Sequence, residues 1–313
     1  MKQVFEDALS GDVRRLARAI SMVEECVPGV EEHLARLRPR RLSAPGSPRV
    51  IGITGPPGAG KSTLVDRLVT GARVAGRTIA VLAVDPSSPF SGGAILGDRL
   101  RMQQHALDTG VFIRSLSARG HTGGLSRATG QVVDLLDSAG WDEIIVETVG
   151  VGQSELAVCQ VADTAVVVLT PESGDTVQAM KAGLIEIADV FVVNKADRPG
   201  ATVLASELEQ TVALGNRGGW DAPVVTASAL EGTGIESAME AIGAHSEWCV
   251  GDGREDWQRR RGEGRLRTFL DLVAEQAVAQ AATALSGPQS ELGLALREGR
   301  LLPSEAFRRT YKE

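Results

Sequence analysis

A glycine-rich segment from Gly55 to Ser62 has the residue types and spacing of a phosphate-binding loop. It consists of Gly55, Pro56, Pro57, Gly58, Ala59, Gly60, Lys61 and Ser62, which fits the Walker A pattern, and Thr63 follows it. The glycines let successive backbone N–H groups converge on an anion, and the helix expected after them adds its positive dipole end. Lys61 can reach the β- and γ-phosphates, and the Ser62 hydroxyl can bind Mg²⁺. The alternative, a glycine-rich turn without a ligand, is disfavoured by the apolar run before the loop and the helical spacing after it.

A second motif, Asn194-Lys195-Ala196-Asp197, follows the apolar run 190–193 and predicts recognition of a guanine base. The Asp197 carboxylate can accept hydrogen bonds from guanine N1–H and from its amine, a donor pair that adenine lacks. The Lys195 stem can cover the base plane, and Asn194 can connect this loop to the phosphate loop. Ser228, Ala229 and Leu230 follow another short apolar run and can offer a backbone N–H to guanine O6. Together the loops favour GTP over ATP, because the wrong base would leave buried polar groups unpaired.

A third motif, Glu147-Thr148-Val149-Gly150, follows the apolar run 144–146. In phosphate-loop proteins an acid here orients Mg²⁺ or its water, and the glycine N–H senses the γ-phosphate. Lys61 and Glu147 are therefore the candidate catalytic residues. Ras-like GTPases carry a water-orienting Gln directly after this glycine, whereas this chain has Val151, and Gln153 lies too far along to take that role. We expect slow intrinsic hydrolysis, with a catalytic group supplied by a partner or a moving loop.

Two more acids stand in a sequence typical of a switch loop. Asp85 ends the apolar run 80–84, and Asp98 follows a glycine-rich stretch. A glycine-rich loop with carboxylates suits a segment that orders around Mg²⁺. The candidate magnesium ligands are therefore Ser62, Asp85, Asp98 and Glu147. The alternative for each of the two loop acids is a local cap or turn.

The pattern of apolar runs predicts an α/β fold with a doubly wound, mostly parallel sheet. The expected strands are 50–54, 78–84, 111–114, 143–147, 164–169, 190–194 and 224–226. We divide the chain into an N-terminal helical extension (1–45), a central nucleotide-binding domain (46–246) and a C-terminal helical arm (247–313). The arm can pack on the core, bind another subunit or simply complete the fold. Its arginines between 254 and 267 are interspersed with acids, which indicates a solvated or partner-facing helix.

Composition narrows the class of protein. The net charge of −7 gives no general attraction to nucleic acid or to a membrane surface. Cys26, Cys159 and Cys249 are far apart, which suggests reduced, buried thiols and not a disulfide framework. Apolar runs are too short to span a membrane, and the first residues lack an apolar signal core. We therefore expect a cytoplasmic protein.

The chain resembles the methylmalonyl-CoA mutase-associated GTPases of the MeaB/ArgK type, a branch of the phosphate-loop GTPases that act as metallocentre and cofactor chaperones. The resemblance lies in four segments: the run 84–90, the run 92–102, the run 147–155 and the run 173–183. It covers the central zone, extends to residues 11–20, and is least specific after Gly251.

The resemblance implies a homodimeric GTPase that controls cofactor loading and protection of a separate adenosylcobalamin-dependent acyl-CoA mutase. The resemblance also allows a cobalamin adenosyltransferase as a further partner. It implies that this chain itself binds no cobalamin. Asp85, Asp98 and Glu147 would lie at the Mg²⁺ and switch region. Asp175 and Lys181 would lie in an additional switch loop, and Gln153 would join them in coupling to the partner.

Two alternatives stay open. A phosphate-loop kinase would transfer the γ-phosphate to a small molecule or protein, although it would not need the Asn-Lys-x-Asp motif. A nickel or zinc metallochaperone would need clustered ligands, whereas His33, His105, His121 and His245 are scattered along the sequence and the cysteines stand alone.

Overall fold

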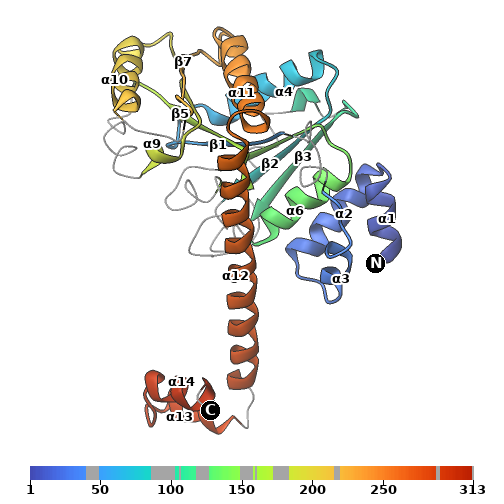
Figure 1. Ribbon diagram of the computed structural model, residues 1–313. Helices are drawn as coiled ribbons and strands as arrows, with labels where there is room; N and C mark the ends of the chain where they lie inside the picture. The colour runs from blue at the N-terminus through green and yellow to red at the C-terminus, as the bar shows by residue number, and fades with distance from the viewer. Residues whose placement is uncertain are drawn as a thin grey trace. The chain divides into compact units, whose positions relative to one another are not determined.

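Parallel strands form the centre of the computed structural model, which describes residues 1–39, 49–85, 103–105, 107–117, 127–148, 158, 161–171, 183–214, 219–286 and 290–311. In chain order the strands described are β1 (Arg49–Thr54), β2 (Ile79–Asp85), β3 (Val111–Ser117), β4 (Glu143–Thr148), β5 (Thr164–Leu169), β6 (Val190–Val193) and β7 (Val224–Thr226). Across the sheet their order is β3-β2-β4-β1-β5-β6-β7, and every neighbouring pair is parallel (Figure 1). This confirms the predicted fold class.

Helices cover both faces of the sheet. In the described ranges they are α4 (Lys61–Val74), α6 (Arg127–Ser138), α9 (Leu184–Ile187), α10 (Ala201–Ala213) and α11 (Ile235–Val250), with a short 3-10 turn, η2 (Gln103–His105). Helices α4 and α11 pack on one face, whereas α6 and, further along the sheet, α10 pack on the other. Because they are covered on both sides, β4 and β5 are buried along their whole length.

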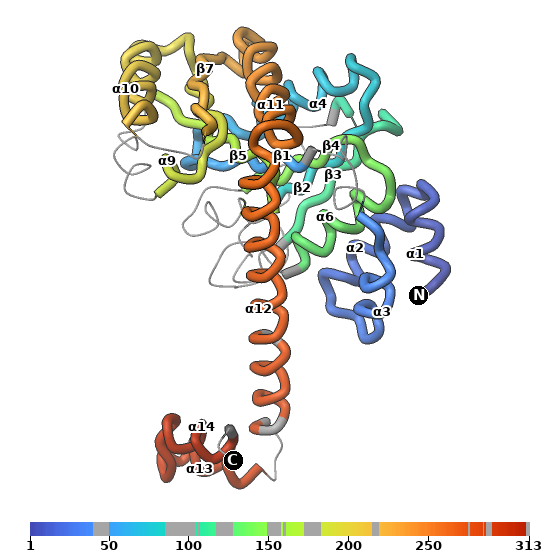
Figure 2. The backbone as a smooth tube through the Cα atoms, viewed as in Figure 1, coloured from blue at the N-terminus to red at the C-terminus, as the bar shows by residue number. Residues whose placement is uncertain are grey.

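Within residues 1–39, three helices precede the sheet: α1 (Lys2–Leu9), α2 (Val13–Glu24) and α3 (Val30–Leu34), and Figure 2 shows them beside α6. Asp12 caps α2, because its Oδ1 accepts the N–H groups of Arg14 (2.9 Å) and Arg15 (3.0 Å). Helix α2 is joined to β3 by an ion pair between Arg114 and Glu24 (2.7 Å). Strand β3 runs three residues beyond its predicted end, because these residues continue the parallel pairing with β2.

The chain ends in α12 (Arg254–Ser286), α13 (Glu291–Arg297) and α14 (Pro303–Tyr311). Its contacts group residues 1–264 into one compact unit and residues 265–313 into another. The three-part division expected from the sequence stays a prediction. Within the described parts of the chain, the helices are all too short or too polar to cross a membrane.

Two expectations from the sequence are wrong. Cys26 is exposed and not buried, because it lies in the turn between α2 and α3. The arginines at the start of α12 are not all solvated, since Arg260 pairs with Asp189 and Arg261 pairs with Asp163.

Candidate functional site

The phosphate-loop segment joins the end of β1 to the start of α4 (Figure 2). Gly60 precedes α4 in the left-handed conformation (φ 84°), and a Cβ there would lie 2.4 Å from Asn194 Nδ2. Gly55 has φ 139°, and a Cβ there would lie 2.1 Å from the Val168 carbonyl oxygen. Both positions therefore need glycine, which leaves the loop backbone free to wrap closely at the N-terminus of α4.

The Lys61 ammonium is held at this loop. Its Nζ donates to the carbonyl oxygens of Gly55 (2.7 Å) and Pro56 (2.9 Å), and the side chain is nearly buried. A buried positive charge beside the N-terminus of a helix is an arrangement that binds phosphate.

Ser62 at the start of α4 and Glu147 of β4 form a buried polar pair. The Ser62 Oγ donates to Glu147 Oε1 at 2.7 Å, and Glu147 is 1% exposed. Glu147 lies opposite Ile53 in the pairing of β4 with β1, which brings it to the start of α4. Hydroxyl and carboxylate oxygens are ligands that Mg²⁺ prefers, and Mg²⁺ takes its remaining ligands from water and phosphate. The residues present therefore fit a magnesium ion.

Asn194 connects the two nucleotide motifs, as the sequence led us to expect. Its Nδ2 donates to the Ala59 carbonyl (2.8 Å), and its Oδ1 accepts the Ala229 N–H (3.0 Å). A single buried amide thus fixes the phosphate loop, the end of β6 and the loop after β7 relative to one another. Lys195 follows with φ 57°, a left-handed conformation that is rare outside glycine.

Asp197 is exposed and bound to the loop after β7. Its Oδ1 accepts the Ser228 hydroxyl at 2.8 Å. This hydrogen bond is the main reason why the pKa of the Asp197 carboxyl lies below its ordinary value. The carboxylate is therefore ionised at neutral pH and can accept hydrogen bonds from a ligand.

The structure thus gathers most predicted site residues at the carboxyl edge of the sheet. They are the run Gly55–Thr63, Glu147, Asn194, Lys195, Asp197 and the run Ser228–Leu230. Asp98, Gly150, Gln153, Asp175 and Lys181 lie outside the described residues, and of Asp85 the structure describes only the backbone. The sequence analysis missed Thr148, whose Oγ1 donates to Thr54 Oγ1 (3.0 Å) and joins the ends of β4 and β1.

A family model described as "Methylmalonyl Co-A mutase-associated GTPase MeaB" matches residues 16–286. The chain belongs to this family. It is accordingly a nucleotide-binding GTPase.

The chain is also similar to named relatives and to a solved structure. A protein of Pyrococcus abyssi that carries a GTPase name is 45% identical over 276 residues, which cover 87% of this chain and 84% of that protein. The mouse mitochondrial methylmalonic aciduria type A homolog is 37% identical over 255 residues, which cover 77% of this chain and 61% of that protein. A crystal structure described as a LAO/AO transport system kinase has a TM-score of 0.69 at 25% identity and covers 98% of this chain and 95% of that one.

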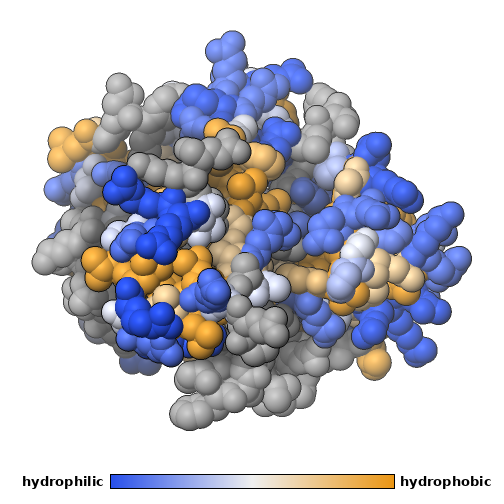
Figure 3. All heavy atoms as spheres, turned by 90° about the horizontal axis from the view of Figure 1, so that it is seen from below, coloured by the Kyte–Doolittle hydropathy of each residue, from blue (hydrophilic) through white to orange (hydrophobic). Residues whose placement is uncertain are grey.

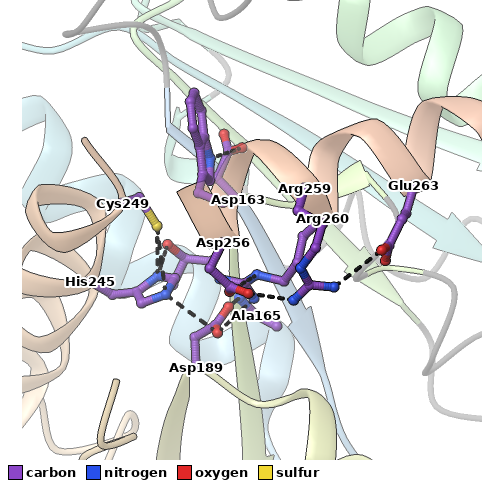
Figure 4. Close-up of polar contacts among 11 residues, drawn as sticks. Asp163, Ala165, Asp189, His245, Cys249, Asp256, Arg259, Arg260 and Glu263 are labelled. Carbon is purple, nitrogen blue, oxygen red and sulfur yellow. Dashed lines mark hydrogen bonds and ion pairs between the residues drawn. The ribbon is translucent and has the colours of Figure 1, made fainter. Parts of the chain in front are cut away.

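A second polar cluster in this MeaB chain lies at the opposite, amino-terminal edge of the sheet (Figure 4). His245 is fully buried, with its ring nitrogens 2.8 Å from Thr164 Oγ1 and 3.3 Å from Asp189 Oδ1. Cys249 lies against the same ring, with 3.7 Å between its Sγ and His245 Nε2, so the expectation that the cysteines stand alone is wrong here. The two residues are one helical turn apart on α11, a spacing that the sequence already contained.

Burial determines the protonation of this pair. It lowers the pKa of His245 and raises the pKa of the Cys249 thiol to about 12. Cys249 is therefore a protonated, unreactive thiol at neutral pH. Across the part of the chain that the structure describes, no group of three or more His, Cys, Asp or Glu side chains could hold a metal ion. The cluster instead connects α11 and the first turns of α12 to the sheet, and the ion pair between Arg260 and Asp189 is part of this connection.

Proposed function

We propose that this MeaB-family GTPase controls cofactor loading onto an adenosylcobalamin-dependent acyl-CoA mutase of the methylmalonyl-CoA mutase type, and protects that enzyme during turnover. The observation that carries the proposal is the family match over residues 16–286, because the family is described by its association with methylmalonyl-CoA mutase. The mouse relative named for methylmalonic aciduria supports the same partner. A cobalamin adenosyltransferase is a further candidate partner.

In the proposed nucleotide complex, the loop Gly55–Thr63 binds the phosphates and Asp197 binds the guanine base. Lys61 leaves the carbonyls of its own loop to contact the β- and γ-phosphates. Ser62 and Glu147 would hold Mg²⁺, together with Asp85 or Asp98, and the ion would supply positive charge against the phosphates. Gly150 would sense the γ-phosphate, while Gln153, Asp175 and Lys181 would transmit the nucleotide state to the mutase.

Hydrolysis by the isolated protein is expected to be slower than about 1 s⁻¹, a limit thousands of times above the intrinsic rate of Ras. The physical reason is the residue after Gly150, which is Val151 and has no group to orient the attacking water. GTP labelled at the γ-phosphate provides the measurement. Label released as free phosphate supports the GTPase. Label transferred to a small molecule or protein would instead support a kinase, the activity by which the similar solved structure is described.

The C-terminal arm supports a homodimer as part of this proposal. Leu266, Phe269, Leu270, Val273 and Val278 of α12 are between 50% and 68% exposed. The first four have the spacing of one helix face, which is typical of a surface that a second helix covers. Figure 3 shows hydrophobic side chains between hydrophilic ones in several places on the face seen from below.

Co-purification tests the function. The full chain is mixed with methylmalonyl-, isobutyryl- and ethylmalonyl-CoA mutases, in GDP or in a non-hydrolysable GTP analogue, and light scattering gives the masses. We expect one mutase to form a complex with the chain, in an amount that depends on the bound nucleotide. We also expect light scattering to give the free chain twice its monomer mass. Failure to bind any of the mutases in either nucleotide state would contradict the proposal.

A further inference from the structure

Arg67 of α4 binds the loop that follows β7. Its Nε donates to the Ala229 carbonyl and its Nη2 donates to the Leu230 carbonyl, both at 2.9 Å. The two donors lie on one edge of the planar guanidinium group, so the side chain can hydrogen-bond to two successive peptide units at the same time. The Leu230 side chain is 79% exposed and therefore cannot fix this part of the loop by packing.

Hydrogen bonds within the protein occupy the other backbone donors of this described loop. The Ser228 N–H bonds to the Thr233 carbonyl (3.0 Å), and the Gly232 N–H bonds to the Ser228 carbonyl (2.8 Å). The Ala229 N–H bonds to Asn194 Oδ1 (3.0 Å), and the Glu231 N–H bonds to Ser228 Oγ (3.4 Å). Among residues 228–232, the N–H of Leu230 is the donor that remains for a ligand.

Arg67 also determines the direction of that donor. The Ala229 carbonyl and the Leu230 N–H belong to the same peptide unit, which is planar and trans, so the two groups point in opposite directions. When Arg67 holds the carbonyl, the Leu230 N–H is directed away from α4. We propose that Arg67 is a positioning residue for base recognition, which presents the Leu230 N–H to guanine O6. This inference rests on the proposed guanine site.

The matched variants Arg67→Lys and Arg73→Lys test the proposal. Lysine keeps the charge but cannot bond both carbonyls through one planar group. Arg73 lies on the same helix, is similarly half-buried, and binds Asp108 (2.9 Å), which is not part of the base loops. Binding of GDP, inosine diphosphate and ADP to the full chain is measured by calorimetry. Inosine diphosphate retains O6 but lacks the amine, and ADP has an amine in place of O6.

Arg67→Lys is expected to lower the affinity for GDP and for inosine diphosphate about tenfold each, which corresponds to the loss of one well-oriented hydrogen bond. The affinity for ADP should stay unchanged. Arg73→Lys should leave all three affinities unchanged. An Arg67→Lys protein that keeps the wild-type ratio of GDP to ADP affinity overturns the inference. An equal loss for all three nucleotides also overturns it, because it would show a purely structural role. A wild-type protein without preference for GDP would refute the guanine site itself.

Discussion

Replacing Lys61 by alanine is expected to lower the affinity for GTP about 100-fold or more, because each hydrogen bond to a charged group is worth about 1.5–3 kcal/mol and the ammonium would contact two phosphates in the proposed complex. Hydrolysis should fall at least as far, since in the proposed complex the same charge would stabilise the transferring phosphoryl group. Calorimetry with GDP and GTP measures the first effect, and release of labelled phosphate measures the second.

The same substitution also removes two hydrogen bonds within the loop, those to Gly55 and Pro56. A thermal melt is therefore needed to show that the variant folds. Lys2→Ala is the control, because Lys2 is 73% exposed and pairs only with the nearby surface acid Glu6 among the ion pairs described. Unchanged GTP affinity in a folded Lys61→Ala protein would show that the glycine loop is not the phosphate site.

The sequence predicted the strands and the loops after them because each signal is local. An apolar run followed by a glycine-rich loop or a polar motif occupies about a dozen residues, and parallel strands bring such loops to one edge of the sheet. The site residues that the structure describes therefore lie where the sequence placed their strands.

The sequence did not predict the contacts between residues that are far apart in the chain. Arg260 and Arg261 look like solvated helix residues, yet they pair with Asp189 and Asp163, which precede β6 and β5. Arg67 similarly gave no sign of its bonds to the Ala229 and Leu230 carbonyls, because backbone oxygens are identical at every position. Such pairings depend on which helix end the fold brings to which loop.

Asp197→Asn is expected to lower GDP affinity about 100-fold or more and to make xanthosine diphosphate the preferred ligand, because sites built around specific hydrogen bonds reject a mismatched analogue strongly. In the proposed complex, the Asp197 carboxylate would accept two hydrogen bonds, from the N1–H and the amine of guanine. Asparagine replaces one acceptor oxygen by an NH₂ donor, which repels the guanine amine. Xanthine carries a carbonyl oxygen at that position, and the new donor matches it.

The Asp197→Asn exchange keeps the loop geometry, since the asparagine carbonyl oxygen can still accept the Ser228 hydroxyl. The phosphates should bind as before, so the reversal appears in the ratio of GDP to xanthosine diphosphate affinities and not in a general loss. Asp221→Asn, at an exposed position outside the two base loops, is the matched control and should leave the ratio unchanged. If the Asp197→Asn protein still preferred GDP, a residue other than Asp197 would recognise the base. The guanine site on which the Arg67 proposal rests would then be wrong.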